Sequence, residues 1–177
     1  MEEQSEIKFV ESKTKVGAEE TKDLKINSET VNFYDDNCQE TGWLTNYWPS
    51  PIQANDKYYP TSEHYFQSVK FTDPEYSEKI RLASTPDEAK IFGQNRTQPI
   101  QADWGNRRIE VMKDALRYKF HQNLELQEKL LSLSGKNIVE HTEDDSFWGD
   151  GGDSTGQNML GKLLMEVRDE LSQLKKL

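Results

Sequence analysis

The sequence predicts one predominantly helical domain with a few short strands. A chain of 177 residues fits a single domain, with or without a tail. Several segments carry apolar residues three or four positions apart, the spacing that places them on one face of a helix. The strand-like runs are short and are bounded by turn residues such as Asn, Asp and Gly.

The composition limits the partners that the surface can gather. The formal net charge of -10 comes from 22 basic and 32 acidic residues, so the surface should repel a polyanion, and contact with nucleic acid would be local. Cys38 is the only cysteine, which excludes an intramolecular disulfide and fits a reducing compartment. No apolar run approaches the roughly 20 residues that span a bilayer, and the N-terminus lacks the regions of a signal peptide. We therefore expect a cytoplasmic or nuclear protein without a membrane partner.

The N-terminal part of the chain predicts a tail followed by the domain. Residues 1–29 are rich in Glu, Lys, Ser and Thr without a sustained apolar period, so we expect a flexible tail, with the domain covering residues 30–177. A strand-like run follows at Val31–Tyr34. Segment 42–51 contains two prolines and three aromatic residues, which favours an ordered loop over a helix. A turn at Asn55–Asp56 then leads into a short strand.

The next segment predicts a helix with a polar face. Thr61 and Ser62 precede an aromatic-rich run, as capping residues do, which places Glu63 in the first turn. Glu63, Gln67 and Lys70 then recur at positions i, i+4 and i+7 and should share one face. The helix dipole favours the ionised carboxylate, so Glu63 suits stabilising a cation or orienting water better than donating a proton. The alternative is that Glu63 is only a first-turn charge.

Further helix-start signals combine a capping side chain with an apolar period. They predict helices that begin after Asp73, Thr85, Asp103, Asn123 and about Asn158. Gly93 and Gly135 should end the second and fourth of these. The leucine stripe of the last helix is a core face or, alternatively, a dimer seam.

An acidic, glycine-rich loop is expected between the last two helices. A short strand at 137–141 precedes it, and its segment 143–153 contains one tryptophan. Such a loop cannot be helical, and its backbone can approach a ligand closely. It could instead be a structural turn or bind a divalent cation, although it lacks the alternating acidic positions of a calcium loop.

Three segments carry polar chemistry that packing does not require: the start of the Glu63 helix, the Asp103–Gly105 helix start and the Asp145–Asp153 loop. Two acidic groups with an aromatic ring suit cleavage of a glycosidic bond, because carboxylates stabilise the oxocarbenium ion and tryptophan can stack the base. Candidate phosphate ligands are Arg81, Arg96, Arg107 and Arg108.

The sequence shows no cofactor or metal motif. Phosphate-loop, nucleophile-elbow and dinucleotide-binding patterns are all missing from it, and its three histidines have no metal-ligand spacing. We therefore expect neither a cofactor nor a metal.

A set of long, ordered motifs extends from about Phe33 to Leu171. It consists of Tyr58–Gln67, Lys70–Phe71, Asp103–Trp104, Lys119–Phe120, Phe147–Gly149, Gly156–Gly161, Leu164–Met165 and Val167–Arg168. Together these motifs resemble the YbiA-like, or NADAR (NAD and ADP-ribose), family. The resemblance implies an α+β, predominantly helical fold in a single YbiA-like domain with a few short strands. It also implies an N-glycosidase, since some members look like hydrolases of ribosylamino-pyrimidine phosphates of riboflavin synthesis and others remove ADP-ribose from guanine.

The resemblance also implies roles for particular residues. Glu63 would be the principal catalytic carboxylate, and Asp145 or Asp150 a second acid. The residues expected to contact the substrate are Asn46, Tyr65, Gln67, Trp104, Trp148, Gly149 and Asn158. Two mechanisms remain open: ionised Glu63 orients water, which we favour, or Lys70 attacks the opened sugar as a Schiff base.

The expected substrate is ADP-ribosylated guanine, as a nucleoside or locally within DNA or RNA, because the domain stands without a fused riboflavin-pathway domain. Hydrolysis of riboflavin intermediates is the alternative. A binding module for ADP-ribose or another nucleotide, without catalysis, is the competing class. We expect a monomer.

Overall fold

The computed structural model describes residues 29–176. Its elements in chain order are β1 (Thr30–Phe33), the short 3-10 helix η1 (Gly42–Leu44), β2 (Ile52–Ala54), β3 (Lys57–Tyr59), α1 (Ser62–Ser68), α2 (Pro74–Arg81), α3 (Pro86–Gly93), α4 (Trp104–Gln122), α5 (Leu124–Ser132), β4 (Asn137–Glu140) and α6 (Met159–Leu174). This content confirms the predominantly helical α+β fold. The tail predicted for residues 1–29 lies outside the described residues except for Glu29.

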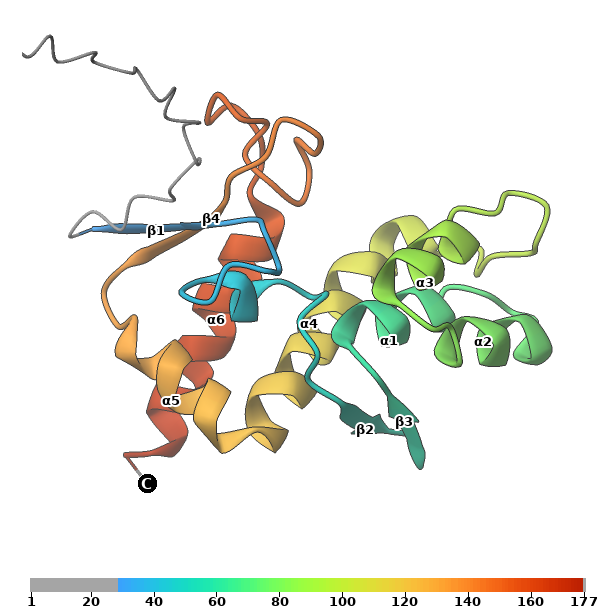
Figure 1. The fold of residues 1–177 in the computed structure, drawn as a ribbon, viewed down its shortest axis with the longest axis horizontal. Helices are drawn as coiled ribbons and strands as arrows, with labels where there is room; N and C mark the ends of the chain where they lie inside the picture. The colour runs from blue at the N-terminus through green and yellow to red at the C-terminus, as the bar shows by residue number, and fades with distance from the viewer. Residues whose placement is uncertain (1–28, 177) are drawn as a thin grey trace, which may run out of the picture.

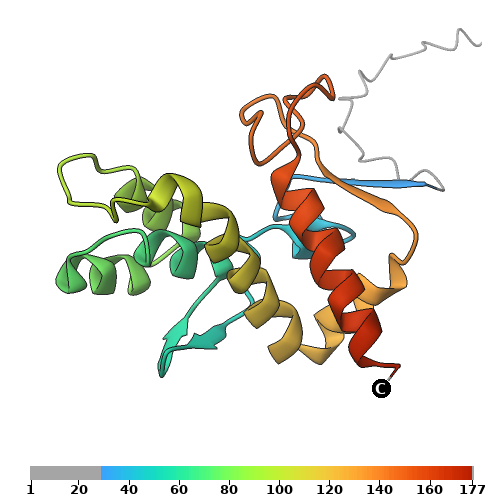
Figure 2. The ribbon, with the colours of Figure 1, turned by 180° about the vertical axis from the view of Figure 1, so that it is seen from behind.

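The long helix α4 separates two groups of elements. Helices α1, α2 and α3 gather on one side of it, and α5, α6 and the β1–β4 pair lie on the other, while the β2–β3 hairpin projects beyond α1 (Figure 1). Seen from behind, α4 and α6 are the two long helices, and they pack against each other (Figure 2). None of the helices in residues 29–176 has the length and apolarity needed to cross a membrane.

One hydrophobic core joins both groups. Its members come from α4 itself and from elements on both sides of it. A smaller, separate cluster of Phe71, Ile80, Ala83 and Ala89 lies at α2 and α3. The leucine stripe of α6 contributes buried residues from Leu160 to Leu171 to this core. It is therefore a core face, the first of the two alternatives that the sequence allowed.

Most predicted helix starts are confirmed by their caps. The side chains of Thr61, Asp73, Thr85 and Asn123 accept hydrogen bonds from backbone N–H groups at the starts of α1, α2, α3 and α5. Helix α4 begins at Trp104, directly after Asp103 as predicted, but the Asp103 side chain does not cap it and lies 3.9 Å from Arg107 in an ion pair instead.

The four strands form two separate pairs. Strand β1 runs parallel to β4 and places Phe33 beside Glu140, so β4 ends where the loop of residues 143–153 begins. Strands β2 and β3 form an antiparallel hairpin. Its turn is the predicted Asn55–Asp56 pair, whose φ angles of 51° and 61° are left-handed, a conformation that Asn and Asp tolerate. The sequence did not predict β2.

Two glycines are required by close approach. Gly93 ends α3 as predicted, but not through a left-handed turn: a Cβ there would lie 2.0 Å from Gln67 Oε1, so α1 and α3 meet where only glycine fits. Gly161, in the first turn of α6, likewise allows α6 to approach β4 closely, because a Cβ there would lie 2.1 Å from the Ile138 carbonyl oxygen. The prediction for Gly135 is confirmed by its φ of 78°.

This close approach predicts the outcome of a matched pair of substitutions in two helices. Gly161→Ala should lower the free energy of unfolding by about 1–3 kcal/mol, because backbone atoms block the added methyl group. Gly105→Ala should leave it unchanged or raise it by up to about 1 kcal/mol, since nothing lies within 4 Å and alanine favours the helix. Urea unfolding of both variants measures the difference, and equal midpoints would contradict the account.

Candidate functional site

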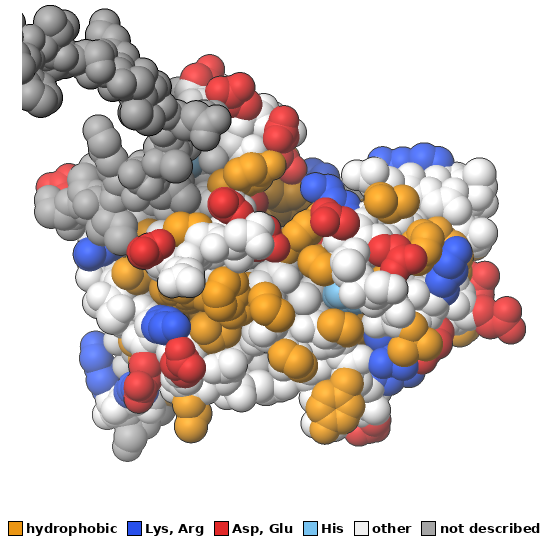
Figure 3. All heavy atoms as spheres, viewed as in Figure 1, with side chains coloured by type: hydrophobic (Ala, Val, Ile, Leu, Met, Phe, Trp, Pro, Cys, Tyr) orange, Lys and Arg blue, Asp and Glu red, His pale blue; other side chains and the backbone are white. Residues whose placement is uncertain are grey.

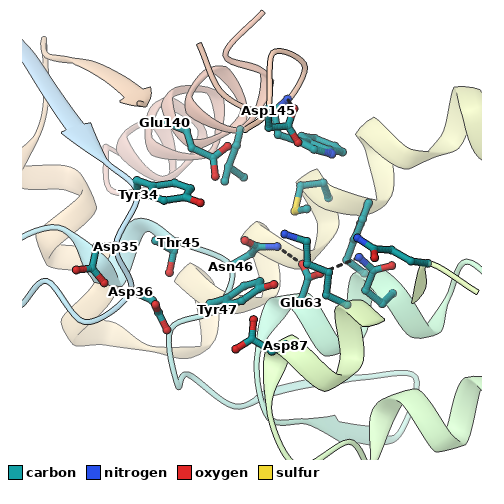
Figure 4. Close-up of a pocket in the computed structure, with 17 residues that line it drawn as sticks. Tyr34, Asp35, Asp36, Thr45, Asn46, Tyr47, Glu63, Asp87, Glu140 and Asp145 are labelled. Atoms are coloured by element: carbon teal, nitrogen blue, oxygen red, sulfur yellow. Dashed lines mark hydrogen bonds between the residues drawn. The ribbon is translucent and has the colours of Figure 1, made fainter. Parts of the chain in front are cut away.

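A cavity of about 460 Å³ opens between the ends of β1 and β4, the start of α1 and helix α3. This volume is in the range of small-molecule sites. Acidic side chains line it from all sides: Asp35, Asp36, Glu63, Asp87, Glu140 and Asp145. Within the described chain, Lys90 is the one cation of the lining. Acidic and hydrophobic side chains surround the hollow on the face shown in Figure 3, and Figure 4 shows how the lining residues lie.

Glu63 projects into this cavity from the first turn of α1 and is 3% exposed. Asn46 Nδ2 donates a hydrogen bond to its Oε2, and Gln67 Nε2 donates one of 2.7 Å to its Oε1, the two dashed contacts of Figure 4. The Glu63 backbone N–H also donates to the Asn46 carbonyl oxygen at 2.9 Å. Both carboxyl oxygens are therefore fixed in place by amide donors.

Burial dominates the protonation of Glu63. Burial raises its pKa to about 7, although the Gln67 hydrogen bond and the charges of Lys90 and Lys70 act in the opposite direction. Burial thus acts against the dipole of the 7-residue helix α1, which favours the ionised form. The pKa of Glu63 therefore lies well above that of an ordinary glutamate.

The loop that carries Asn46 is held in place by a hydrogen bond from a buried lysine. Lys119 of α4 is 1% exposed, and its Nζ donates a 2.6 Å hydrogen bond to the Thr45 carbonyl oxygen. Burial lowers the pKa of Lys119 to about 7. Thr45 Oγ1 also donates to the Gly42 carbonyl oxygen at 2.8 Å. Sequence reasoning assigned Lys119 no role. The one available signal was that Lys119–Phe120 is among the motifs that resemble the NADAR family.

Glu140, at the end of β4, points into the cavity from the wall opposite Glu63 (Figure 4). Its Oε2 atom is buried and has no hydrogen-bond partner among the described residues. Burial raises its pKa to about 8, and the charges of Asp145 and Glu63 act in the same direction. Sequence reasoning missed this residue. Its position at the end of a predicted strand, just before the acidic loop, was the signal that could have found it.

Asn158, predicted to contact substrate, lies behind Glu140 and outside the cavity lining. Its Oδ1 accepts a 2.9 Å hydrogen bond from the Glu140 N–H, and its Nδ2 donates one of 2.9 Å to the Ile138 carbonyl oxygen. Its φ of 47° is left-handed, and its side chain bonds to β4 instead of capping α6. Asn158 thus sets the position of the end of β4.

The two candidate second acids have different surroundings. Asp145 lines the cavity, and its Oδ1 accepts hydrogen bonds from the N–H groups of Phe147 and Trp148 at 2.7 and 2.8 Å. Asp150 lies outside the lining and binds His141 Nδ1 at 2.8 Å. Burial alone would raise the pKa of Asp150, but the hydrogen bonds from His141 and from backbone N–H groups bring it below its usual value. Asp150 therefore braces the loop that carries Asp145.

The other predicted residues divide between the cavity and the core. Asn46, Gln67 and Trp148 line the cavity. Tyr65, Trp104 and Gly149 are buried outside its lining. The ring of Tyr65 packs against two other tyrosine rings, and that of Trp104 lies 5.2 Å from the ring of Phe66, a lining residue.

Helix α1 ends at Ser68, so Lys70 lies beyond the helix that carries Glu63 and Gln67. It lies outside the cavity lining, and its Nζ donates a 2.5 Å hydrogen bond to the Gly93 carbonyl oxygen. Burial lowers its pKa.

The buried carboxyl group of Glu63 and the half-buried one of Glu140, on opposite walls of the cavity, suit general acid–base chemistry on a glycosidic bond. Phe66 and Trp148, whose ring centres lie 5.6 Å apart, add an aromatic wall for a base. Among residues 29–176, no three His, Cys, Asp or Glu side chains are grouped so that they could hold a metal ion.

Comparison with known proteins identifies relatives over most of the chain. The chain is 45% identical over 142 residues to N-glycosidase YbiA of Shigella boydii, covering 80% of this chain and 88% of that protein. It is 38% identical over 148 residues to a riboflavin biosynthesis protein of Vibrio vulnificus, covering 84% of this chain and 40% of that protein. The NMR structure of Escherichia coli YbiA superposes with a TM-score of 0.78 at 42% identity, covering 85% of this chain and 89% of that one.

A family model describes the domain directly. The model of the NADAR domain matches residues 32–172, which contain every element from η1 to β4 and all the cavity residues described above. This match confirms the resemblance seen in the sequence motifs. The chain therefore belongs to the NADAR family.

Proposed function

We propose that this chain is an N-glycosidase that hydrolyses the bond between ribose and a base. The observation that carries the proposal is Glu63, a buried carboxyl group whose two oxygens are oriented by Asn46 and Gln67 within the acidic cavity. An oriented carboxylate in a site of low dielectric stabilises positive charge on the sugar and can accept a proton from water. The N-glycosidase name of the Shigella boydii relative supports the same reaction.

In the proposed reaction, the ionised form of Glu63 acts on the sugar. Its carboxylate stabilises the oxocarbenium ion as the bond to the base breaks, and it accepts a proton from the water that attacks C1′. The amides of Asn46 and Gln67 prevent the carboxylate from rotating away. Trp148, in the aromatic wall, supplies a surface on which the base can stack.

The position of Lys70 supports water as the nucleophile over a Schiff base. A Schiff-base lysine has to reach C1′ within the cavity, whereas Lys70 lies outside the lining and its Nζ is bound to the Gly93 carbonyl oxygen.

For the substrate, we propose ADP-ribosylated guanine. The six acidic residues of the lining disfavour phosphate inside the cavity and favour a base whose edge presents N–H donors. Guanine has such an edge. Candidate phosphate ligands are Lys90, the one cation of the described lining, and Arg96, which lies outside that lining. Neither has an ion-pair partner among the described residues.

Ribosylamino-pyrimidine phosphates are the second candidate substrate. The name of the Vibrio vulnificus relative favours them, and an aminopyrimidine also presents N–H donors. Incubation with each substrate, followed by mass spectrometry of the released base, decides between the two. Binding of either without release would instead support the module that recognises a nucleotide without cleaving it.

Replacing Glu63 should remove most of the activity. Glu63→Gln should lower kcat by about 100- to 10,000-fold, because an amide neither accepts the proton nor stabilises the cation. Glu75→Gln is the matched control, since Glu75 also lies in the first turn of a helix but is exposed on α2. Steady-state rates of base release, with thermal unfolding to confirm folding, test the prediction. A Glu63→Gln protein with wild-type kcat would remove Glu63 from the reaction.

The nucleophile can be tested separately. Borohydride added during turnover should leave the intact mass of the protein unchanged, because attack by water forms no covalent intermediate. A mass increase that corresponds to a reduced ribose adduct would establish a Schiff base and overturn this part of the mechanism.

A further inference from the structure

We propose that Glu140 is the catalytic acid of this site, which protonates the leaving base while Glu63 acts on the sugar. The inference rests on the proposed N-glycosidase function and extends it to a residue that the sequence motifs did not indicate. Three independent features support it: the distribution of hydrogen-bond donors, the charges around the cavity, and the contacts that hold the end of β4.

The hydrogen-bond donors distinguish the two carboxyl groups. Both oxygens of Glu63 accept an amide N–H, an arrangement that favours a carboxylate. Glu140 Oε2 is buried and has no donor among the described residues. A buried carboxylate oxygen without a donor is costly, whereas a protonated one can donate its own hydrogen to a ligand. Of the two groups, Glu140 is therefore the one suited to carry the proton.

The surrounding charges act in the same direction. The charged and titratable groups that face Glu140 from neighbouring elements are Tyr34, Glu63, Lys90, Asp145 and Asp150. Three of these are carboxyl groups, which oppose a further negative charge at Glu140, and one is a cation. These charges and burial raise the pKa of Glu140, and burial raises that of Glu63, so both carboxyl groups can hold a proton near neutral pH. The amide donors on Glu63, which Glu140 Oε2 lacks, favour Glu63 as the group that ionises first.

The end of β4 is fixed from several sides. Asn158 binds the backbone on both sides of Val139, and the Glu140 carbonyl oxygen accepts a hydrogen bond of 2.9 Å from the Asp150 N–H. Asn158 adopts a left-handed conformation to make its contacts, and Gly161 leaves the space that its side chain occupies. Asn158 is thus a positioning residue, and the side chain that it positions is Glu140.

The C1′–N bond breaks with its electron pair passing to the base, and that nitrogen takes the proton of the Glu140 carboxyl group. Water adds its oxygen to C1′ and gives a proton to the Glu63 carboxylate. The products are the free base and ribose with a hydroxyl group at C1′. Exchange with solvent returns Glu140 to its protonated form and Glu63 to its ionised form.

This assignment predicts a bell-shaped dependence of kcat on pH in the wild-type protein. Activity should rise as Glu63 ionises near pH 7 and fall as Glu140 loses its proton near pH 8. Glu140→Gln should lower kcat by about 100- to 10,000-fold and abolish the alkaline fall, because no acid remains to lose a proton. A purely structural role would lower the rate and leave the alkaline fall in place.

Glu143→Gln is the matched control, because Glu143 is an exposed glutamate of the following loop outside the cavity lining. It should keep both the wild-type rate and the wild-type pH profile. If Glu140→Gln does not fold, Glu140→Asp provides the test: a carboxyl group that is one methylene shorter should lower kcat at least about tenfold and retain an alkaline fall.

The outcomes separate this inference from the proposed function. A wild-type protein that releases base, together with a Glu140→Gln variant that is folded and keeps either wild-type kcat or the alkaline fall, would overturn the role of Glu140 alone. Wild-type kcat in Glu140→Asp would overturn it in the same way. A wild-type protein that releases no base from either candidate substrate would overturn the proposed function and the inference with it.

Discussion

The site depends on the burial of Glu63, whose carboxyl oxygens accept hydrogen bonds from side-chain amides in place of water. Burial of a carboxyl group is costly, and the Asn46 and Gln67 hydrogen bonds offset part of that cost while fixing its orientation. The same burial brings its pKa into the neutral range, where a carboxyl group can take up and release protons. An exposed first-turn glutamate such as Glu75 shares its local sequence setting but not these properties.

Much of the fold serves to hold two carboxyl groups at opposite walls of one cavity. On one wall, Gly93 allows α3 to approach Gln67, and buried Lys119 holds the segment that carries Asn46. On the other wall, Asn158 and the first turn of α6 hold the end of β4. Each wall uses one close approach that only glycine permits and one polar side chain that binds the backbone, buried Lys119 on one wall and half-buried Asn158 on the other. The cavity is therefore a product of tertiary packing, although its acids lie in short local motifs.

The parts of the structure that local chemistry decides could be predicted from the sequence. The caps Thr61, Asp73 and Asn123 act over two or three residues, so the helix starts and the place of Glu63 were accessible. The role of Glu140 was not, because its partner Asn158 lies 18 residues away and its unpaired oxygen exists only in the folded chain. The raised pKa of Glu63 was inaccessible for the same reason: a dipole can be inferred from a helix start, but burial depends on residues that are distant in the sequence.

Glu63, whose two oxygens accept amide hydrogen bonds, should ionise before Glu140, whose buried Oε2 has no donor among the described residues. A pH titration of the side-chain carboxyl carbons by ¹³C NMR measures this directly, with Glu63→Gln and Glu140→Gln proteins used to assign the signals. Both groups should titrate well above the ordinary glutamate value of 4.5, and Glu140 should titrate above Glu63. Titration of either group near 4.5, or of Glu63 above Glu140, would contradict it.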